Sequence, residues 1–125
     1  MTTQRRLIGY WRNELHPEYP DPADLVDESW DEDERHAVWA YTVGGTMAFS
    51  FMGLSPCRRC GKPNGALELT DGVYQWPDGL AHYVMEHAVR LPQEFVDHAL
   101  SRLDALEAER ADLAWWLTET APKAD

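Results

Sequence analysis

The clearest pattern in the chain is a stripe of apolar residues in its last third. Apolar positions recur there every three or four residues: Val96, Ala99, Leu100, Leu103, Leu106, Leu113 and Leu117. This spacing gathers the side chains on one face of an α-helix. We therefore predict one helix over residues 93–119, directly after Pro92, because proline fits the first turn of a helix. Arg110 interrupts the stripe.

A second helix is predicted to begin at Ser29. Ser29 and Glu32 have the spacing of a capping box, in which a serine and a glutamate three positions later satisfy free backbone amides. The glycine pair at 44–45 ends this helix, since glycine readily adopts the conformation that follows a helix. Residues 46–52 are mostly apolar and predict a strand.

A β-hairpin followed by a third helix is predicted next. Two short β-type segments, 66–70 and 73–76, flank an Asp-Gly dipeptide at 71–72. Asp-Gly between two such segments is a strong hairpin signal. Asp78 is placed to cap the following helix, which we expect over residues 79–90.

Residues 1–28 show no clear periodicity and are predicted to form an irregular acidic arm. Three prolines between positions 17 and 22 exclude a helix there. Ten acids and no lysine or arginine occupy residues 14–34. Four apolar residues in this stretch are expected to anchor the arm to the domain: Tyr19, Leu25, Val26 and Trp30. A solvated linker is the alternative.

The length of 125 residues predicts a single domain over residues 1–125. The chain holds 22 acidic residues against 11 lysines and arginines, a formal net charge of -11. Proteins bind nucleic acid largely by neutralising phosphates with basic side chains, so this charge disfavours nucleic acids and anionic membranes. No apolar run reaches the roughly 18 residues that a membrane-spanning helix needs, and no secretory signal is recognisable. We expect a cytoplasmic protein.

The two cysteines, Cys57 and Cys60, form a Cys-x2-Cys motif followed by glycine. A disulfide between cysteines this close would span only a tiny loop and could not hold a domain together. In a reducing compartment such a pair indicates metal binding or redox chemistry. His82 and His87 follow, five positions apart on the predicted helix. Zinc prefers four thiolate and imidazole ligands in a tetrahedron, and histidines three to five positions apart are accepted partners. The sequence thus predicts a structural zinc ion bound by these four residues.

The order of elements around these ligands resembles the treble-clef class of zinc folds: a Cys-x2-Cys-Gly knuckle, a hairpin, and a helix with a His-x4-His pair. The run from Cys-Arg-Arg-Cys-Gly at 57–61 to Val-Arg-Leu-Pro at 89–92 is similar to small bacterial zinc-binding proteins with such a knuckle. The resemblance implies an α+β fold, with a zinc-binding centre over residues 46–90 flanked by helices. It assigns no activity.

Other chemistries fit the cysteine pair less well. A thioredoxin-type dithiol opens a helix, whereas Gly61, Pro63 and Gly65 follow the pair here. Four protein ligands would close the coordination sphere that a catalytic zinc keeps open for water. The histidine spacing also departs from the patterns of zinc hydrolases, so no catalytic residue is assigned. His98 is the alternative to His87 if the register of the helix differs.

Two further groups are candidates for partner binding. Trp115 and Trp116 are adjacent, so at most one can face a helical core squarely, and tryptophan is enriched at binding hot spots. Packing of one of them in the core or under the acidic arm is the alternative. Arg58, Arg59 and Lys62 form the only basic cluster, on the knuckle. These three could bind an anion or an acidic partner, or pair with the chain's own acids.

The charge and the closed ligand set favour a non-enzymatic, zinc-stabilised acidic protein-binding module. Its expected partner is a protein with a basic face, since opposite charge speeds association. An immunity-like or regulatory adaptor role would suit such a protein. The alternatives are a zinc-dependent hydrolase or nuclease, and a nucleic-acid-binding zinc module that uses the basic cluster. The oligomeric state stays open.

Overall fold

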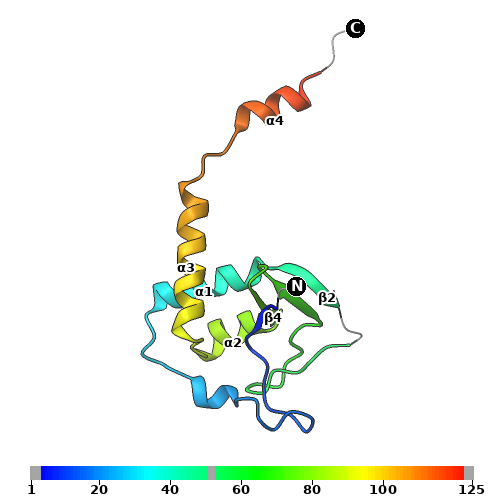
Figure 1. The fold of residues 1–125 in the computed structure, drawn as a ribbon, viewed down its shortest axis with the longest axis vertical. Helices are drawn as coiled ribbons and strands as arrows, with labels where there is room; N and C mark the ends of the chain where they lie inside the picture. The colour runs from blue at the N-terminus through cyan, green and yellow to red at the C-terminus, as the bar shows by residue number, and fades with distance from the viewer. Residues whose placement is uncertain (1–3, 51–52, 123–125) are drawn as a thin grey trace.

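A four-stranded sheet with helices packed beside it forms the body of the molecule, and the C-terminal helices rise away from it (Figure 1). The computed structural model describes residues 4–50 and 53–122. Within these ranges the elements are β1 (Arg6–Leu7), the 3-10 helix η1 (Pro22–Leu25), α1 (Glu32–Val43), β2 (Thr46–Ser50), β3 (Leu67–Thr70), β4 (Tyr74–Pro77), α2 (Leu80–His87), α3 (Gln93–Ala108) and α4 (Leu113–Thr120). This confirms the predicted mixed α+β class. No helix in the described ranges is long and apolar enough to cross a membrane.

The predicted hairpin is the centre of the sheet, whose strand order is β1-β4-β3-β2. β3 and β4 pair antiparallel, with Leu69 opposite Trp76. The carboxylate of Asp71 closes the turn, because it accepts hydrogen bonds from the amides of Val73 (2.9 Å) and Tyr74 (2.7 Å). Val73 therefore belongs to the turn, and the prediction that it begins the second strand was wrong.

The two edges of the sheet differ in how well the sequence predicted them. β2 pairs antiparallel with β3 and covers the predicted strand 46–52 except for residues 51–52, which lie outside the described residues. β1 pairs parallel with β4, and the Arg6 and Ile8 amides donate to the carbonyls of Val73 (2.9 Å) and Gln75 (3.0 Å). The prediction of an arm without regular structure was therefore wrong at β1 and at η1.

α1 begins two residues later than a cap at Ser29 would place it. Its N-cap is Asp31, whose carboxylate accepts a hydrogen bond from the Glu34 amide at 2.9 Å. Ser29 is engaged elsewhere, because its amide and hydroxyl both donate to Asp27 (3.0 and 2.6 Å). The helix ends at Gly44, as predicted.

α2 is shorter than the predicted helix over 79–90. Ala88 follows it in the left-handed conformation, with φ of 50°, and this ends the helix after His87. Asp78 does not cap α2, whose N-cap is Gly79. The Asp78 carboxylate instead accepts a hydrogen bond from the Leu67 amide at 3.3 Å, which ties the two ends of the hairpin together.

The predicted single helix over 93–119 is two helices in the structure. α3 ends at Ala108, and the backbone of Glu109 is extended. α4 begins after Asp112, whose carboxylate accepts a hydrogen bond from the Trp115 amide at 2.9 Å. Only the first half of α3 contributes buried side chains. Beyond it, no packing holds a long helix straight, and packing is the main source of helix stability in proteins.

The core lies between the sheet and α1, α2 and the first half of α3. Its largest fully buried side chains are Trp76, Phe95, Leu80, Val38, Val84, Val89, Val96 and Thr42. The Trp76 indole donates a hydrogen bond to the Thr42 carbonyl at 3.0 Å. This bond satisfies a polar group that would otherwise be costly to bury.

Three of the four predicted anchors hold the acidic arm on this core, whereas Tyr19 is absent from the core and stacks on His16 instead. Trp30 is buried, and Leu25 and Val26 pack against the core. Val26 also forms a β-bridge with Val89, just after α2. Trp11, which the sequence did not single out as an anchor, is buried as well. The alternative of a solvated linker is therefore wrong for these parts of the arm.

Candidate metal centre

The knuckle is a tight turn closed by its own backbone. The Cys57 amide donates to the Lys62 carbonyl, and the Gly61 amide donates to the Cys57 carbonyl, both at 2.8 Å. Gly61 has a φ of +75°, a conformation that costs a residue with a side chain about 1 kcal/mol or more. The turn therefore depends on glycine at this position, and it presents both cysteines from one short loop.

The structure brings the four predicted ligands together. One donor atom from each of Cys57, Cys60, His82 and His87 lies within 4.8 Å of all the others. The Cys60 Sγ is 3.4 Å from the His82 Nε2, which is 3.3 Å from the His87 Nε2. Cys57 is buried and Cys60 is exposed, and neither forms a disulfide. This group could hold a metal ion.

The structure brings the two histidines of α2 together despite their five-residue spacing. His82 lies in its first turn and His87 is its last residue. On a regular helix, five positions correspond to a rotation of about 140°. The two rings nevertheless meet edge to face, with centroids 5.0 Å apart and planes at 76°. Ala88 follows in the left-handed conformation, and the Val89 amide turns back to the Tyr83 carbonyl at 3.1 Å.

Close packing fastens the knuckle to the start of α2. The Asn64 side chain donates a hydrogen bond to the Gly79 carbonyl at 3.1 Å. A Cβ atom on Gly79 would overlap the Asn64 carbonyl oxygen, and one on Gly65 would overlap the Asp78 carboxylate. Their pairing joins segments far apart in the chain, which no local motif indicates.

The surroundings of Cys57 and His87 favour the protonation states that bind metals. Burial acts to raise the pKa of the Cys57 thiol, but hydrogen bonds from the Arg59 and Cys60 amides, the Cys60 thiol and the Tyr83 hydroxyl outweigh it and lower this pKa. Burial lowers the pKa of His87, and the neighbouring charge of His82 lowers it further. Thiolates and neutral imidazoles are the forms that coordinate metals.

The basic cluster on the knuckle is exposed, and its members differ in their contacts. The Arg58 guanidinium donates to the Arg12 carbonyl, and the Arg58 amide donates to the Tyr83 hydroxyl at 2.8 Å. Among the described residues, no salt bridge joins Arg58, Arg59 or Lys62 to an acid. The alternative that these charges pair with the chain's own carboxylates is therefore not what the structure shows.

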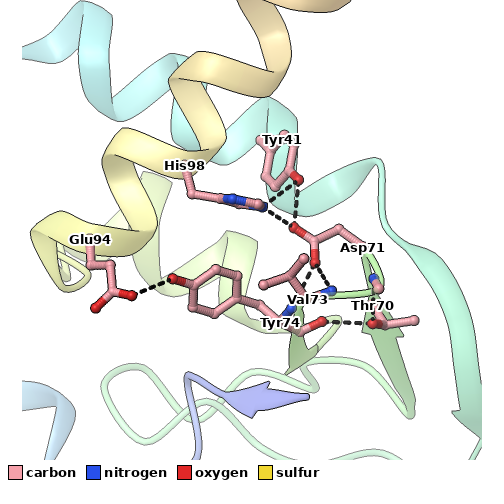
Figure 2. A network of polar contacts seen from close by, with 8 residues as sticks. Tyr41, Thr70, Asp71, Val73, Tyr74, Glu94 and His98 are labelled. Atoms are coloured by element: carbon pink, nitrogen blue, oxygen red, sulfur yellow. Dashed lines mark hydrogen bonds and ion pairs between the residues drawn. The ribbon is translucent and has the colours of Figure 1, made fainter. Parts of the chain in front are cut away.

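His98, the alternative fourth ligand, belongs to a different cluster (Figure 2). Its Nε2 lies 2.8 Å from the Asp71 Oδ2, at the turn of the hairpin. The Tyr41 hydroxyl donates to the same oxygen at 2.5 Å. Three elements meet here, because Tyr41 lies on α1, Asp71 follows β3 and His98 lies on α3. The cluster fastens α3 to the hairpin and takes no part in the candidate metal centre.

Replacing Asp71 by alanine is expected to lower the free energy of unfolding by about 2 kcal/mol, because it leaves partly buried donors without an acceptor. Burial alone would raise the pKa of Asp71, but hydrogen bonds from Tyr41, from the amides of Tyr74 and Val73 and from His98 lower it below its ordinary value. The carboxylate therefore stabilises the fold at neutral pH, and this contribution is lost as the pH falls below about 4.

Urea unfolding of the wild-type chain and the Asp71→Ala variant at several pH values tests this expectation. The difference in stability should be largest at neutral pH and should shrink on acidification. Asp97→Ala is the control. Asp97 is an exposed acid on α3, next to His98, and its replacement should change stability by less than about 0.5 kcal/mol. A difference that stays constant down to low pH would contradict the role assigned to the charge.

The predicted partner-binding tryptophans both lie on α4, which has no buried residue. Trp115 is 60% exposed and Trp116 is 56% exposed. The alternative that one of them packs in the core or under the acidic arm is therefore wrong. The apolar spacing that suggested burial reflects an amphipathic helix whose apolar side chains remain in contact with water.

Comparison with other proteins gives no further guide to this site. Neither protein families nor curated proteins nor solved structures gave a match. A function is therefore inferred from the four-donor cluster, the exposed α4 and the net charge of the chain.

Proposed function

We propose that the chain is a zinc-stabilised, non-enzymatic protein-binding module with a treble-clef-like centre. In a tetrahedral site with two thiolates and two imidazoles, neighbouring donor atoms are separated by about 3.3–3.8 Å. The separations of 3.3 and 3.4 Å at His82 agree with that geometry. The chain order of knuckle, hairpin and helix supports the comparison with a treble clef.

A structural role for the ion follows from the donor set. Four protein donors complete a tetrahedron, whereas catalytic zinc sites keep one position for water. Two thiolates also neutralise the charge of the ion, which weakens it as a Lewis acid. Such an ion would instead stabilise the knuckle against α2, in a reducing compartment such as the cytoplasm, where cysteines stay free for metals.

The exposed apolar face of α4 is the main observation in support of protein binding. Leu113, Trp116 and Leu117 have the i, i+3, i+4 spacing of a helix that anchors in a groove of its partner. All three are more than half exposed. In monomeric proteins, contiguous apolar patches of this kind mark interaction sites. Trp115 points about 100° away from Trp116, toward the opposite side of the helix.

The negative charge around α4 indicates which kind of partner protein would bind there. Residues 101–120 contain five acids and two arginines, a net charge of -3, and the whole chain carries -11. We therefore expect a partner protein with an apolar groove rimmed by lysine and arginine. Its association should slow as salt screens the charges. An immunity-like or regulatory adaptor protein would have these properties.

Replacing Trp116 by alanine is expected to weaken partner binding by about 2 kcal/mol, roughly 30-fold, as at other tryptophan hot spots. Stability should not change, because the side chain buries little in the free chain. Trp115→Ala is the matched control, since it removes the same side chain from the opposite side of α4. Partners are recovered with the tagged chain from the source organism, and their affinity is measured by calorimetry at two salt concentrations.

Equal affinities of the Trp116→Ala and Trp115→Ala variants would contradict the assignment of the binding face. Binding that does not respond to salt would contradict the basic partner. A recovered partner that binds only when the two arginines and the lysine of the knuckle are intact would instead favour the basic cluster as the contact surface.

A further inference from the structure

A cavity lies beside the knuckle, separate from the candidate metal centre and away from α4. It has a volume of about 650 Å³, is open to solvent and is lined by residues of the segment 9–19, the knuckle, the hairpin and the start of α2. None of the four candidate metal ligands lines it. Its volume is in the range of small-molecule binding sites, about 300–1,000 Å³. The Arg12 amide donates to the Pro20 carbonyl at 2.9 Å, which closes the loop that forms one wall.

Four aromatic side chains line this cavity: Tyr10, Trp11, Tyr19 and Tyr83. The rings of Trp11 and Tyr83 pack edge to face with centroids 5.4 Å apart, and both residues are buried. Aromatic rings carry negative charge on their faces. Walls of this kind attract organic cations, and a flat guanidinium can also stack on them.

The charged groups of the cavity point to the same class of ligand. Its lining includes two carboxylates, those of Glu68 and Asp78, and one guanidinium, that of Arg58. The Tyr10 hydroxyl donates to Glu68 Oε1 at 2.6 Å, and this leaves Oε2 without a hydrogen bond from the described residues. The Arg58 guanidinium donates to the neutral Arg12 carbonyl and keeps its positive charge. With two carboxylates and one guanidinium, the lining carries a formal net charge of -1.

We infer that this cavity binds an alkylguanidinium group, with its flat cation against the aromatic walls and Glu68 as its carboxylate partner. A guanidinium stacks on aromatic faces and pairs with a carboxylate through two parallel hydrogen bonds. The group can come from a free small molecule or from an arginine side chain of a bound protein. The site does not involve α4, so it goes beyond the proposed function and can fail independently of it.

The test is a titration of the zinc-loaded full chain with butylguanidinium, N-butylurea and butyrate. N-butylurea has nearly the same shape without the charge, and butyrate has the opposite charge. Binding is followed by the NMR signals of the Trp11 indole and of the Glu68 and Asp78 amides. We expect saturable shifts with butylguanidinium at concentrations up to about 20 mM and an affinity for N-butylurea that is lower by about 10-fold or more.

N-acetylarginine amide separates the two sources of the group. Tighter binding of this compound than of butylguanidinium assigns the site to an arginine side chain of a protein, and weaker binding assigns it to a free small molecule. Either result supports a guanidinium site. Equal binding of N-butylurea, preference for butyrate, or the absence of saturable binding would each overturn the inference.

Glu68→Gln tests the carboxylate with little change in shape, because the amide oxygen can still accept from Tyr10. We expect about a 10-fold loss of butylguanidinium affinity. Glu107→Gln removes the same charge from an exposed position on α3 and should leave the affinity unchanged. Tyr19→Leu removes one aromatic wall from a partly exposed loop and should weaken binding about threefold. Unchanged affinity in both cavity variants, with the wild-type unfolding midpoint, would refute the site.

Discussion

Replacing Cys57 by serine is expected to abolish stoichiometric metal binding and to lower the free energy of unfolding by about 5 kcal/mol or more. Structural zinc supplies folding free energy on the order of 10 kcal/mol, and a serine hydroxyl is a poor substitute for a thiolate. The Cys57 side chain also packs in the core, where the residue is 2% exposed. Metal content by mass spectrometry under native conditions and urea unfolding measure the two effects.

A second variant separates loss of the metal from damage to the core. Cys60 is exposed, so Cys60→Ser removes a ligand without disturbing buried packing. We expect it to lose the metal and to have the stability of the wild-type chain treated with a chelator. Ser55→Ala, an exposed change two positions before Cys57, should retain both metal and stability. A Cys60→Ser variant that keeps a full equivalent of tightly bound metal would rule out the four-ligand centre.

Cobalt provides an independent measure of the ligand set. Two sulfurs and two nitrogens in a tetrahedron give cobalt(II) a characteristic visible absorption with a thiolate charge-transfer band. Titration of the metal-free chain should produce this spectrum at one equivalent, and His87→Ala should alter it. His98→Ala should leave it unchanged, because His98 contacts Asp71 and Tyr41 instead. The two histidine variants thereby decide between the alternatives that the sequence left open.

The parts of the fold that the sequence predicts well are those set by local chemistry. The Asp-Gly dipeptide fixed the position of the hairpin, since the Asp71 side chain binds two amides of its own turn. The candidate metal-binding group was accessible for the same reason. A Cys-x2-Cys turn and a histidine pair on one helix each form within a few residues, and only their meeting requires the fold.

The break between α3 and α4 shows where periodicity misleads. A spacing of three and four states which residues share a helix face, but it does not state whether any surface covers that face. α3 packs against the rest of the domain only along its first half. The cap at Asp112 was readable in the sequence, because an aspartate three positions before Trp115 is a typical N-cap. The apolar stripe, which resumes at Leu113 beyond the interruption at Arg110, concealed it.

Neither the cluster around Asp71 nor the cavity beside the knuckle could be predicted from the sequence. Asp71 meets Tyr41 and His98 across 30 and 27 positions of the chain. Glu68 meets Tyr10 across 58 positions. Contacts of this kind depend on how whole elements pack, and the strand β1, which positions the segment before Tyr10, is only two residues long. No pattern of that length is distinguishable from a loop.

Gly79→Ala is expected to lower the free energy of unfolding by about 3 kcal/mol, at the upper end of the usual cost of overpacking, and to weaken zinc binding. The new Cβ would overlap the Asn64 carbonyl oxygen and lie 2.7 Å from the Asn64 side-chain amide. The φ of Gly79 is -68°, which alanine adopts without strain, so the steric overlap decides the sign. Relief requires the knuckle to move away from α2, which separates the cysteines from the histidines.

Gly44→Ala is the matched control for this substitution. Gly44 also has an ordinary φ of -84°, but a Cβ there would lie 3.6 Å from its nearest neighbours. We therefore expect its stability to stay within about 0.5 kcal/mol of wild type. Urea unfolding gives the stability of both variants, and competition with a chromophoric chelator gives their zinc affinity. If the two alanines behave alike, the knuckle is not held rigidly on the start of α2, and the metal alone keeps the four donors together.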